Sequence, residues 1–314
     1  MKRKKIVITG GSGLIGRAVT ERLLAGGHEV VWLSQSQTPL KASEKNRLSI
    51  IPWDPTGKTA LDPDVLSARN GVSSVVHLAG ARVDQRWTTR AKQAIRDSRV
   101  ISTQVLTNAM AALPQEDRPA AFIAGSAIGW YSTGEERFDE NSPHGHGFLS
   151  DVVVDWEAAI ARAAGLGLRV AIVRTGLVLS ASHGMLGRLL PLYRWGLGSP
   201  IGSGQQWQSW IHLADLARLF VHLLEDAETH GVFNGVAPEG SAIRQQGLSE
   251  SLAEALGKPH FLPRVPEFAL RLVFGDMADT ILASQQVIPR RTAATGFKWD
   301  FPDLASALRD LVDS

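Results

Sequence analysis

The sequence contains no cysteine among its 314 residues, which excludes disulfides, thiolate metal sites and cysteine nucleophiles. It also has no apolar run that approaches the ~20 residues needed to cross a membrane. The first apolar stretch, Ile6–Ile8, is too short for a signal peptide and is followed at once by glycines. We therefore expect a cytoplasmic protein that has no membrane partner.

The chain has almost no excess of charge of either sign, because 33 Lys and Arg residues oppose 31 Asp and Glu residues. This balance gives no electrostatic argument for a nucleic-acid partner. The nine histidines show no spacing typical of metal ligands, so we predict no metal site. A content of 44% hydrophobic and 20% charged residues is typical of a globular protein with an ordinary core.

Short β-branched runs alternate with longer helical patterns, which is typical of βαβ units and a parallel sheet. The fold class we predict is α/β, a doubly wound parallel Rossmann sheet with a smaller C-terminal substrate lobe. The core is expected over 1–176, continued by about 209–236, with the lobe and a C-terminal extension over 177–208 and 237–314. Expected strands are 5–8, 29–33, 48–51, 74–78, 120–124, 169–174 and 231–234, and expected helices are 14–25, 90–112, 149–164 and 304–311.

A glycine-rich loop follows the first expected strand and opens the first expected helix. It reads Thr9-Gly10-Gly11-Ser12-Gly13-Leu14-Ile15-Gly16, with glycines at the GxGxxG spacing. In that context Gly10 permits a tight turn, Gly13 lets backbone approach a pyrophosphate, and Gly16 lets the helix pack close to the strand. The free amides and the dipole of the helix N-terminus favour an anion. The loop therefore predicts binding of a dinucleotide cofactor.

The end of the second strand indicates which dinucleotide is bound. NAD specificity normally needs a carboxylate there for the ribose 2′-hydroxyl, but Leu33-Ser34-Gln35-Ser36 contains none. A 2′-phosphate would meet no repulsion, so NADP(H) is favoured over NAD(H), with Ser34 and Gln35 beside the ribose. No arginine stands there either, and Lys41 would have to reach in from the following loop. Trp53, after the third strand, is expected to border the adenine pocket.

Several further blocks resemble the extended short-chain dehydrogenase/reductases, the clan of nucleotide-sugar epimerases and dehydratases. The match is closer to an atypical epimerase-like subfamily that has its own C-terminal extension. The clan blocks are His77–Gly80, Gly125–Tyr131, Arg174–Leu179 and Ser209–Asp215. The subfamily blocks are Arg86-Trp87-Thr88, Asp155-Trp156-Glu157, Gly202–Gln205, Ser284–Pro289 and Gly296-Phe297.

The resemblance implies that NADP(H) is bound, and in this subfamily no physiological substrate is established. It adds cofactor-contacting positions to the phosphate loop: Leu78, Ala79, Gly80, Gly125, Leu177, Val178 and Arg99. Arg99 stands where the clan usually has an asparagine, and three roles are open to it. It can meet a cofactor anion, meet a substrate anion, or pair with a carboxylate of the protein.

The clan's chemistry rests on a Tyr-x-x-x-Lys pair, in which the lysine lowers the tyrosine pKa so that the phenol exchanges a proton near neutral pH. This sequence has two tyrosines, and neither has a lysine four residues on: Tyr131 is followed by Glu135 and Tyr193 by Leu197. Alignment on Glu157 places Leu149 and Val153 at the two positions. The pair is absent, so the fold alone does not carry the epimerase reaction.

Two candidate catalytic residues remain. Ser126 either hydrogen-bonds a substrate oxygen or caps a turn, and Tyr131 either supplies a proton or is structural. The glycine- and tryptophan-rich stretch from Gly184 to Trp210 is expected to form loops over the cofactor, where tryptophans either stack on a ligand or pack in a core.

Two hypotheses follow from these residues. The first is an NADP(H)-dependent, epimerase-like oxidoreductase that acts on a small polar substrate, sugar- or nucleotide-like in character. The second is an NADP(H)-binding sensor or regulatory protein that turns nothing over. The missing Tyr-Lys pair favours the sensor, whereas the serine block and the polar, tryptophan-rich lobe favour the enzyme.

Overall fold

The computed structural model describes residues 3–35 and 47–313. A seven-stranded parallel sheet runs through it in the order β11-β7-β5-β4-β1-β2-β3. Its strands are β1 (Lys5–Thr9), β2 (Glu29–Ser34), β3 (Leu48–Pro52), β4 (Val72–His77), β5 (Ala121–Ala127), β7 (Arg169–Thr175) and β11 (Gly231–Gly235). The Rossmann sheet predicted from the sequence is confirmed.

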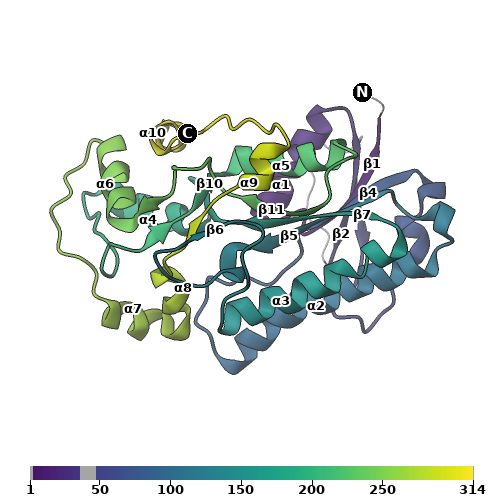
Figure 1. Ribbon diagram of the computed structural model, residues 1–314, viewed down its shortest axis with the longest axis horizontal. Helices are drawn as coiled ribbons and strands as arrows, with labels where there is room; N and C mark the ends of the chain where they lie inside the picture. Colours follow the sequence, from purple (N-terminus) through teal and green to yellow (C-terminus); the bar gives the residue numbers. More distant parts are fainter. Residues whose placement is uncertain (1–2, 36–46, 314) are drawn as a thin grey trace.

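Helices cover both faces of this sheet (Figure 1). On β1, Ile6 and Ile8 join the core beneath α1 (Leu14–Ala25) and α5 (Leu213–Glu225), whereas Val7 joins the core on the opposite face. That second core lies beneath α2 (Thr89–Ala112) and α3 (Phe148–Ala161). Because both faces are buried, the strand is apolar at successive positions. The sheet is therefore doubly wound, as expected.

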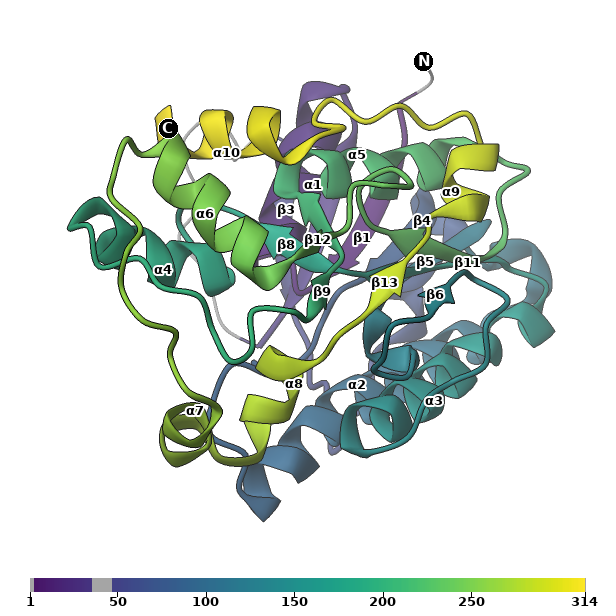
Figure 2. The same ribbon diagram turned by 60° about the vertical axis from the view of Figure 1, so that its left-hand side comes forward.

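A separate apolar cluster forms beyond the sheet, where α4 (Gly184–Arg194), α6 (Gln245–Ala255) and α10 (Leu304–Asp313) pack together. Figure 2 shows these three helices on the same side of the molecule. From the sequence, residues 184–210 are expected to form loops and short elements, and the 11-residue helix α4 at the start of this stretch is longer than that expectation. Pro191 lies inside this helix, yet burial of Leu186, Leu190 and Tyr193 holds it together.

The C-terminal segment then returns to the part of the fold that contains β6 (Arg137–Phe138). After α7 (Glu267–Phe274) and α8 (Ala278–Leu282), β13 (Gln286–Val287) pairs with β6 (Arg137–Phe138), as Figure 2 shows. The remaining elements are β8 (Leu177–Leu179), β9 (Trp207–Gln208), β10 (Trp210–His212), β12 (Ile243–Arg244), α9 (Arg290–Ala294) and short 3₁₀ turns at 63–66, 68–70, 115–117, 128–130, 164–166 and 275–277.

The strand that carries Ser126 is longer than predicted. β5 continues past Ala124 to Ala127, because β7 pairs with it along its whole length and sets Ser126 opposite Arg174. At the neighbouring strand, β4 ends at His77, so Leu78 begins the loop that follows. Ser126 therefore stands on a rigid strand end.

Within residues 3–35 and 47–313, no helix combines the length and apolar character needed to cross a bilayer. The same residues contain no group of three His, Asp or Glu side chains arranged to hold a metal ion. The cytoplasmic location stays a prediction.

Candidate functional site

A cavity of about 950 Å³ opens at the carboxyl ends of β1, β4, β5 and β7. In doubly wound sheets, ligands bind at this edge, where the strand order reverses direction. The cavity is lined by phosphate-loop residues on one side and by residues of α3 and the C-terminal segment on the other. It therefore spans the region where a dinucleotide and a second ligand could meet.

The three glycines at the GxGxxG positions of the phosphate loop differ in their surroundings. Gly10 has a φ of 68°, and a Cβ there would lie 2.6 Å from the Leu78 carbonyl oxygen. A Cβ on Gly16 would clash with the Gly10 carbonyl, whereas one on Gly13 would meet only the Gly10 oxygen, at 3.2 Å. Gly13 lines the cavity and is the N-cap of α1, and as a glycine it has no side chain with which to cap the helix amides. The loop thus presents an open helix N-terminus that fits a phosphate.

Most of the residues predicted from the sequence border the cavity. Those that line it are Gly10, Gly13, Leu14, Ile15, Gly16, Leu78, Gly80, Arg99, Gly125, Ser126, Tyr131 and Leu177. Those that do not line it are Gly11, Ser12, Ser34, Gln35, Trp53, Ala79 and Val178. Ser36 and Lys41 lie outside the described residues.

Two of the non-lining residues are held by the core. Gly11 lies against the ring of Trp32, so any side chain there would collide with it. Trp53 is 8% exposed and packs in the apolar cluster on the α2 side of the sheet. The expected contact between Trp53 and an adenine ring stays a prediction.

Ser126 donates its hydroxyl proton to a buried carboxylate. Its Oγ lies 2.6 Å from Oε1 of Glu157, which comes from α3. Because that proton is engaged, the Ser126 oxygen is left to accept a hydrogen bond from a ligand in the cavity. The sequence analysis used Glu157 only to align the chain and assigned it no role.

Glu157 is itself held by Arg174 in a bidentate ion pair. The Arg174 Nε and Nη2 atoms each lie 2.8 Å from a carboxylate oxygen of Glu157. Both side chains are buried, at 3% and 9% exposure. The guanidinium also lies over the Trp130 ring, 3.8 Å from its centroid. A buried pair in this geometry is costly to break from one side.

The hydroxyl of Tyr131 is tied into the same network. It donates to Oδ1 of Asn234 at 2.7 Å and accepts from Nη1 of Arg174 at 3.1 Å. Burial raises the pKa of Tyr131 to about 12, although Arg174 acts in the opposite direction. The phenol is therefore neutral near pH 7 and already bonded within the protein. A catalytic Tyr131 stays a prediction that would require its hydroxyl to leave Asn234.

The two positions of the missing catalytic pair form an apolar wall. Leu149 and Val153 both line the cavity on α3, together with Val152 and Phe148. Polar residues, among them Thr133, His146, Gln208 and Gln285, line other parts of the cavity. No basic side chain on this stretch of α3 occupies the place where the clan carries its lysine.

The three tryptophans considered from the sequence have different environments. Trp210 is fully buried and Trp195 is 84% exposed. Trp207 lines the cavity, and Arg244 stacks on its ring at 4.0 Å from the centroid. Trp210 therefore packs in a core, whereas Trp207 alone of the three borders the cavity.

His77 organises the loop after β4. Thr9 Oγ1 accepts the amide protons of Leu78 and Ala79, so it donates its own proton to His77 Nδ1 at 2.6 Å. The other ring nitrogen lies 3.0 Å from Thr103 Oγ1. Burial lowers the pKa of His77 to about 3, followed in effect by the charge of Arg99. His77 is thus a neutral, structural residue at the floor of the site.

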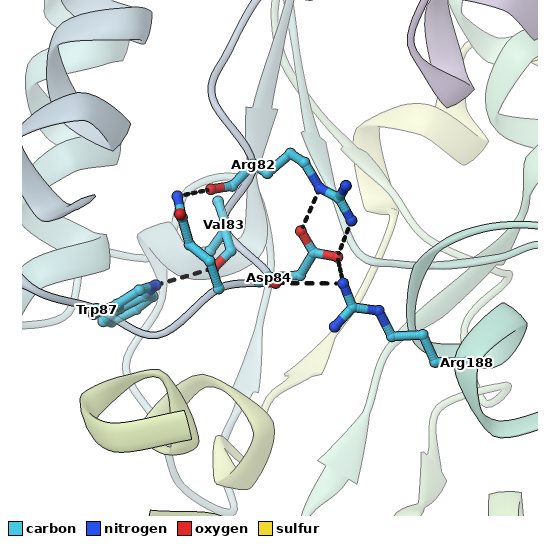
Figure 3. Close-up of polar contacts among 6 residues, drawn as sticks. Arg82, Val83, Asp84, Trp87 and Arg188 are labelled. Carbon is cyan, nitrogen blue, oxygen red and sulfur yellow. Dashed lines mark hydrogen bonds and ion pairs between the residues drawn. The ribbon is translucent and has the colours of Figure 1, made fainter. Parts of the chain in front are cut away.

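An ion-pair cluster joins the loop after β4 to α4 (Figure 3). Asp84, in that loop, accepts from Arg82 at 3.0 Å and from Arg188 of α4 at 2.6 Å. Of these three residues, Arg82 lines the cavity. In the same loop, Trp87 donates to the Val83 carbonyl. The cluster could not be predicted from the sequence, because Asp84 and Arg188 are 104 positions apart.

Comparisons with known proteins agree with this geometry. Residues 6–234 match the model of the NAD dependent epimerase/dehydratase family, and residues 265–311 match a domain of unknown function, DUF1731. The human epimerase family protein SDR39U1 is 37% identical over 314 residues, covering 98% of this chain and 99% of that protein. Its chloroplastic homologue from Arabidopsis thaliana is 35% identical, covering 98% of this chain and 86% of that protein.

Solved structures extend the comparison. The crystal structure of human SDR39U1 (isoform 2) with NADPH has a TM-score of 0.86 and 35% identity, and covers 99% of both chains. The structure of MoeE5 with UDP-glucuronic acid and NAD has a TM-score of 0.77 at 20% identity, covering 98% of both chains, which shows a shared fold alone.

Proposed function

Since the chain belongs to the NAD dependent epimerase/dehydratase family, we propose that it binds NADP(H) in the cavity and acts on a small polar substrate as an epimerase-like oxidoreductase. The observation that carries the cofactor proposal is the phosphate loop, with Gly13 open to the cavity at an uncapped helix N-terminus. The NADPH in the similar human structure supports the same choice.

The phosphate loop and the residues at the strand ends would contact different parts of the cofactor. Gly10–Gly16 would receive the pyrophosphate, while Leu78, Gly80, Gly125 and Leu177 would border the rest of the molecule along the strand ends. Gly11, Ser12, Ala79 and Val178 would contribute through backbone. Ser34 and Gln35 stand in a stretch, Leu33 to Ser36, whose sequence has no carboxylate, and would tolerate a 2′-phosphate. When bound, NADPH supplies the hydride for a reduction.

Ser126 is the proposed contact to the substrate. Its proton is committed to Glu157, so Ser126 would accept the proton of a substrate hydroxyl and orient the adjacent carbon. Arg174 fixes Glu157, and Tyr131 fixes Arg174, so the polar floor behind Ser126 is rigid. Trp207 offers a ring for a sugar-like or flat ligand to stack on, and the Gln208 amide lies beside it.

The substitution Gly13→Val tests the cofactor site. A side chain here meets little of the protein but projects where a pyrophosphate would lie, so the variant should fold and lose NADPH binding. Gly134→Val is the matched control, because none of the described residues lies within 4 Å of a Cβ added there. Calorimetric titration with NADPH decides: normal binding by a folded Gly13→Val protein would place the cofactor elsewhere.

A regulatory role is the second candidate function. Leu149 and Val153 take the two positions of the clan's Tyr-Lys pair, and the Tyr131 hydroxyl is hydrogen-bonded to Asn234. An assay of hydride transfer to a panel of small carbonyl compounds separates the enzyme from the sensor. The loss of NADPH absorbance measures the transfer. An enzyme should oxidise NADPH with at least one of these compounds, and the rate should fall in the Ser126→Ala variant. A sensor should bind NADPH and oxidise it with none of the compounds tested.

A further inference from the structure

Arg99 differs from the other cations around the cavity in having no carboxylate partner. Arg82 is paired with Asp84 at 3.0 Å, and Lys92 with Asp276 at 2.7 Å. Arg99 lines the same cavity, yet none of the acidic side chains in the described part of the chain lies within 4.0 Å of it. Its Nη1 atom donates hydrogen bonds to the backbone oxygens of Ala81 and Ile95.

The surroundings of Arg99 leave its charge unbalanced. The guanidinium faces the ring of Trp156 at 5.3 Å and lies against Gly80, where a Cβ would come within 3.1 Å of Cζ. Burial lowers the pKa of Arg99 to about 10. It therefore stays protonated at neutral pH, and among the described residues its desolvation is offset by two carbonyl dipoles and the face of the Trp156 ring, without a carboxylate. The indole Nε1 of Trp156 is likewise buried without an acceptor among the residues described.

Arg99 and the phosphate loop come from opposite faces of the sheet. The pyrophosphate would bind at the N-terminus of α1, which covers one face. Arg99 comes from α2 on the other face, where α3 supplies Trp156 and, one residue on, the Glu157 that holds Ser126. The guanidinium therefore lies on the same face as the residues that position Ser126, next to the Gly80 backbone.

We propose that Arg99 binds an anionic oxygen of the substrate, so that the substrate is an acid that carries a carboxylate or a phosphate. The inference deepens the proposed function and rests on it, because it takes NADP(H) to occupy the phosphate-loop end of the cavity. A guanidinium binds such groups through paired N–H donors, and among the described Lys and Arg residues that line this cavity Arg99 is the one without a protein carboxylate to compete.

The test uses the NADPH-saturated protein with oxalate and inorganic phosphate as probes, at constant ionic strength set with chloride. Binding is followed by calorimetry. We expect Arg99→Met to weaken probe binding at least about tenfold, the size of a charge-assisted hydrogen bond, while its affinity for NADPH stays within about threefold. The Arg99→Lys variant keeps the charge but loses the planar guanidinium, so its affinity for the probes should lie between those of the unmodified protein and of Arg99→Met.

Arg96→Met is the matched control. It removes one positive charge from the same helix, but Arg96 does not line the cavity and pairs with Asp155 at 2.7 Å. Its probe binding should match the unmodified protein. Arg99→Met loses the bonds to the Ala81 and Ile95 carbonyls, so its melting temperature with NADPH bound is measured to check that it is folded. If Arg99→Met does not fold, the test is made with Arg99→Lys.

Three results would overturn the inference. One is a large loss of NADPH affinity in the Arg99 variants, which would make Arg99 a cofactor contact. Another is equal probe binding by all variants, and the third is no probe binding by the unmodified NADPH complex. Failure of the unmodified protein to bind NADPH at all would instead refute the proposed function, and is seen before any probe is added.

Discussion

Replacing Arg174 by methionine should destabilise the protein far more than removing a surface arginine. Arg174 makes two 2.8 Å contacts with Glu157 and one 3.1 Å bond to Tyr131, and is 3% exposed. Its removal leaves the buried Glu157 carboxylate with the Ser126 hydroxyl as its one donor among the described residues. Breaking a buried pair from one side typically costs about 3–5 kcal/mol, so we expect a loss of that size in the free energy of unfolding.

Urea denaturation followed by tryptophan fluorescence measures the loss. Arg188→Met is the comparison, because Arg188 is 51% exposed in its pair with Asp84 and should cost no more than about 1 kcal/mol. The double variant Arg174→Met with Glu157→Leu should recover part of the stability, since it leaves no unpaired buried charge. A single Arg174→Met variant within about 1 kcal/mol of the unmodified protein would refute the reasoning.

Three further predictions concern pH, chemistry and mobility. Burial lowers the folded-state pKa of His77 to about 3, against 6.5 in the unfolded chain. The stability that depends on neutral His77 is therefore present above pH 6.5 and is lost as the pH falls, by about 1.4 kcal/mol per pH unit. In urea titrations, the free energy of unfolding of His77→Gln should decline less steeply between pH 6.5 and 5 than that of the unmodified protein, and parallel curves would contradict this. Epimerisation of UDP-galactose or UDP-glucose should be negligible in a coupled assay, because the absent Tyr-Lys pair normally contributes ~10²–10⁴-fold, and turnover near ~1 s⁻¹ would show that another base acts. Hydrogen exchange over residues 184–210 should slow when NADPH and an acidic ligand are both present, since closure would protect its backbone; unchanged exchange would indicate a rigid lobe.

The sequence predicted those parts of the fold that depend on local pattern. The run Lys5–Ile8, the phosphate loop and the helix 14–25 follow from β-branched residues, glycine spacing and helical periodicity, and the structure has them at nearly those bounds. It did not predict α4, because Pro191 and the surrounding glycines resemble a loop. That helix depends on burial against α6 and α10, which only the folded chain provides.

The candidate site was predicted less completely than the fold. Ser126 and Arg99 could be singled out because they stand in or near family blocks, and both line the cavity. The partner of Ser126 could not, since Glu157 lies 31 positions away and its approach depends on how α3 packs on β5. Contacts of this kind are set by tertiary geometry, on which spacing along the chain gives no information.

Calorimetric titration of the purified protein with NADPH and with NADH decides whether this chain is an NADP(H)-binding protein. Because the sequence has no carboxylate from Leu33 to Ser36, we expect NADPH to bind, and to bind more tightly than NADH. Equal affinities, or a preference for NADH, would contradict the choice of NADP(H), and no binding of either would exclude both proposed functions.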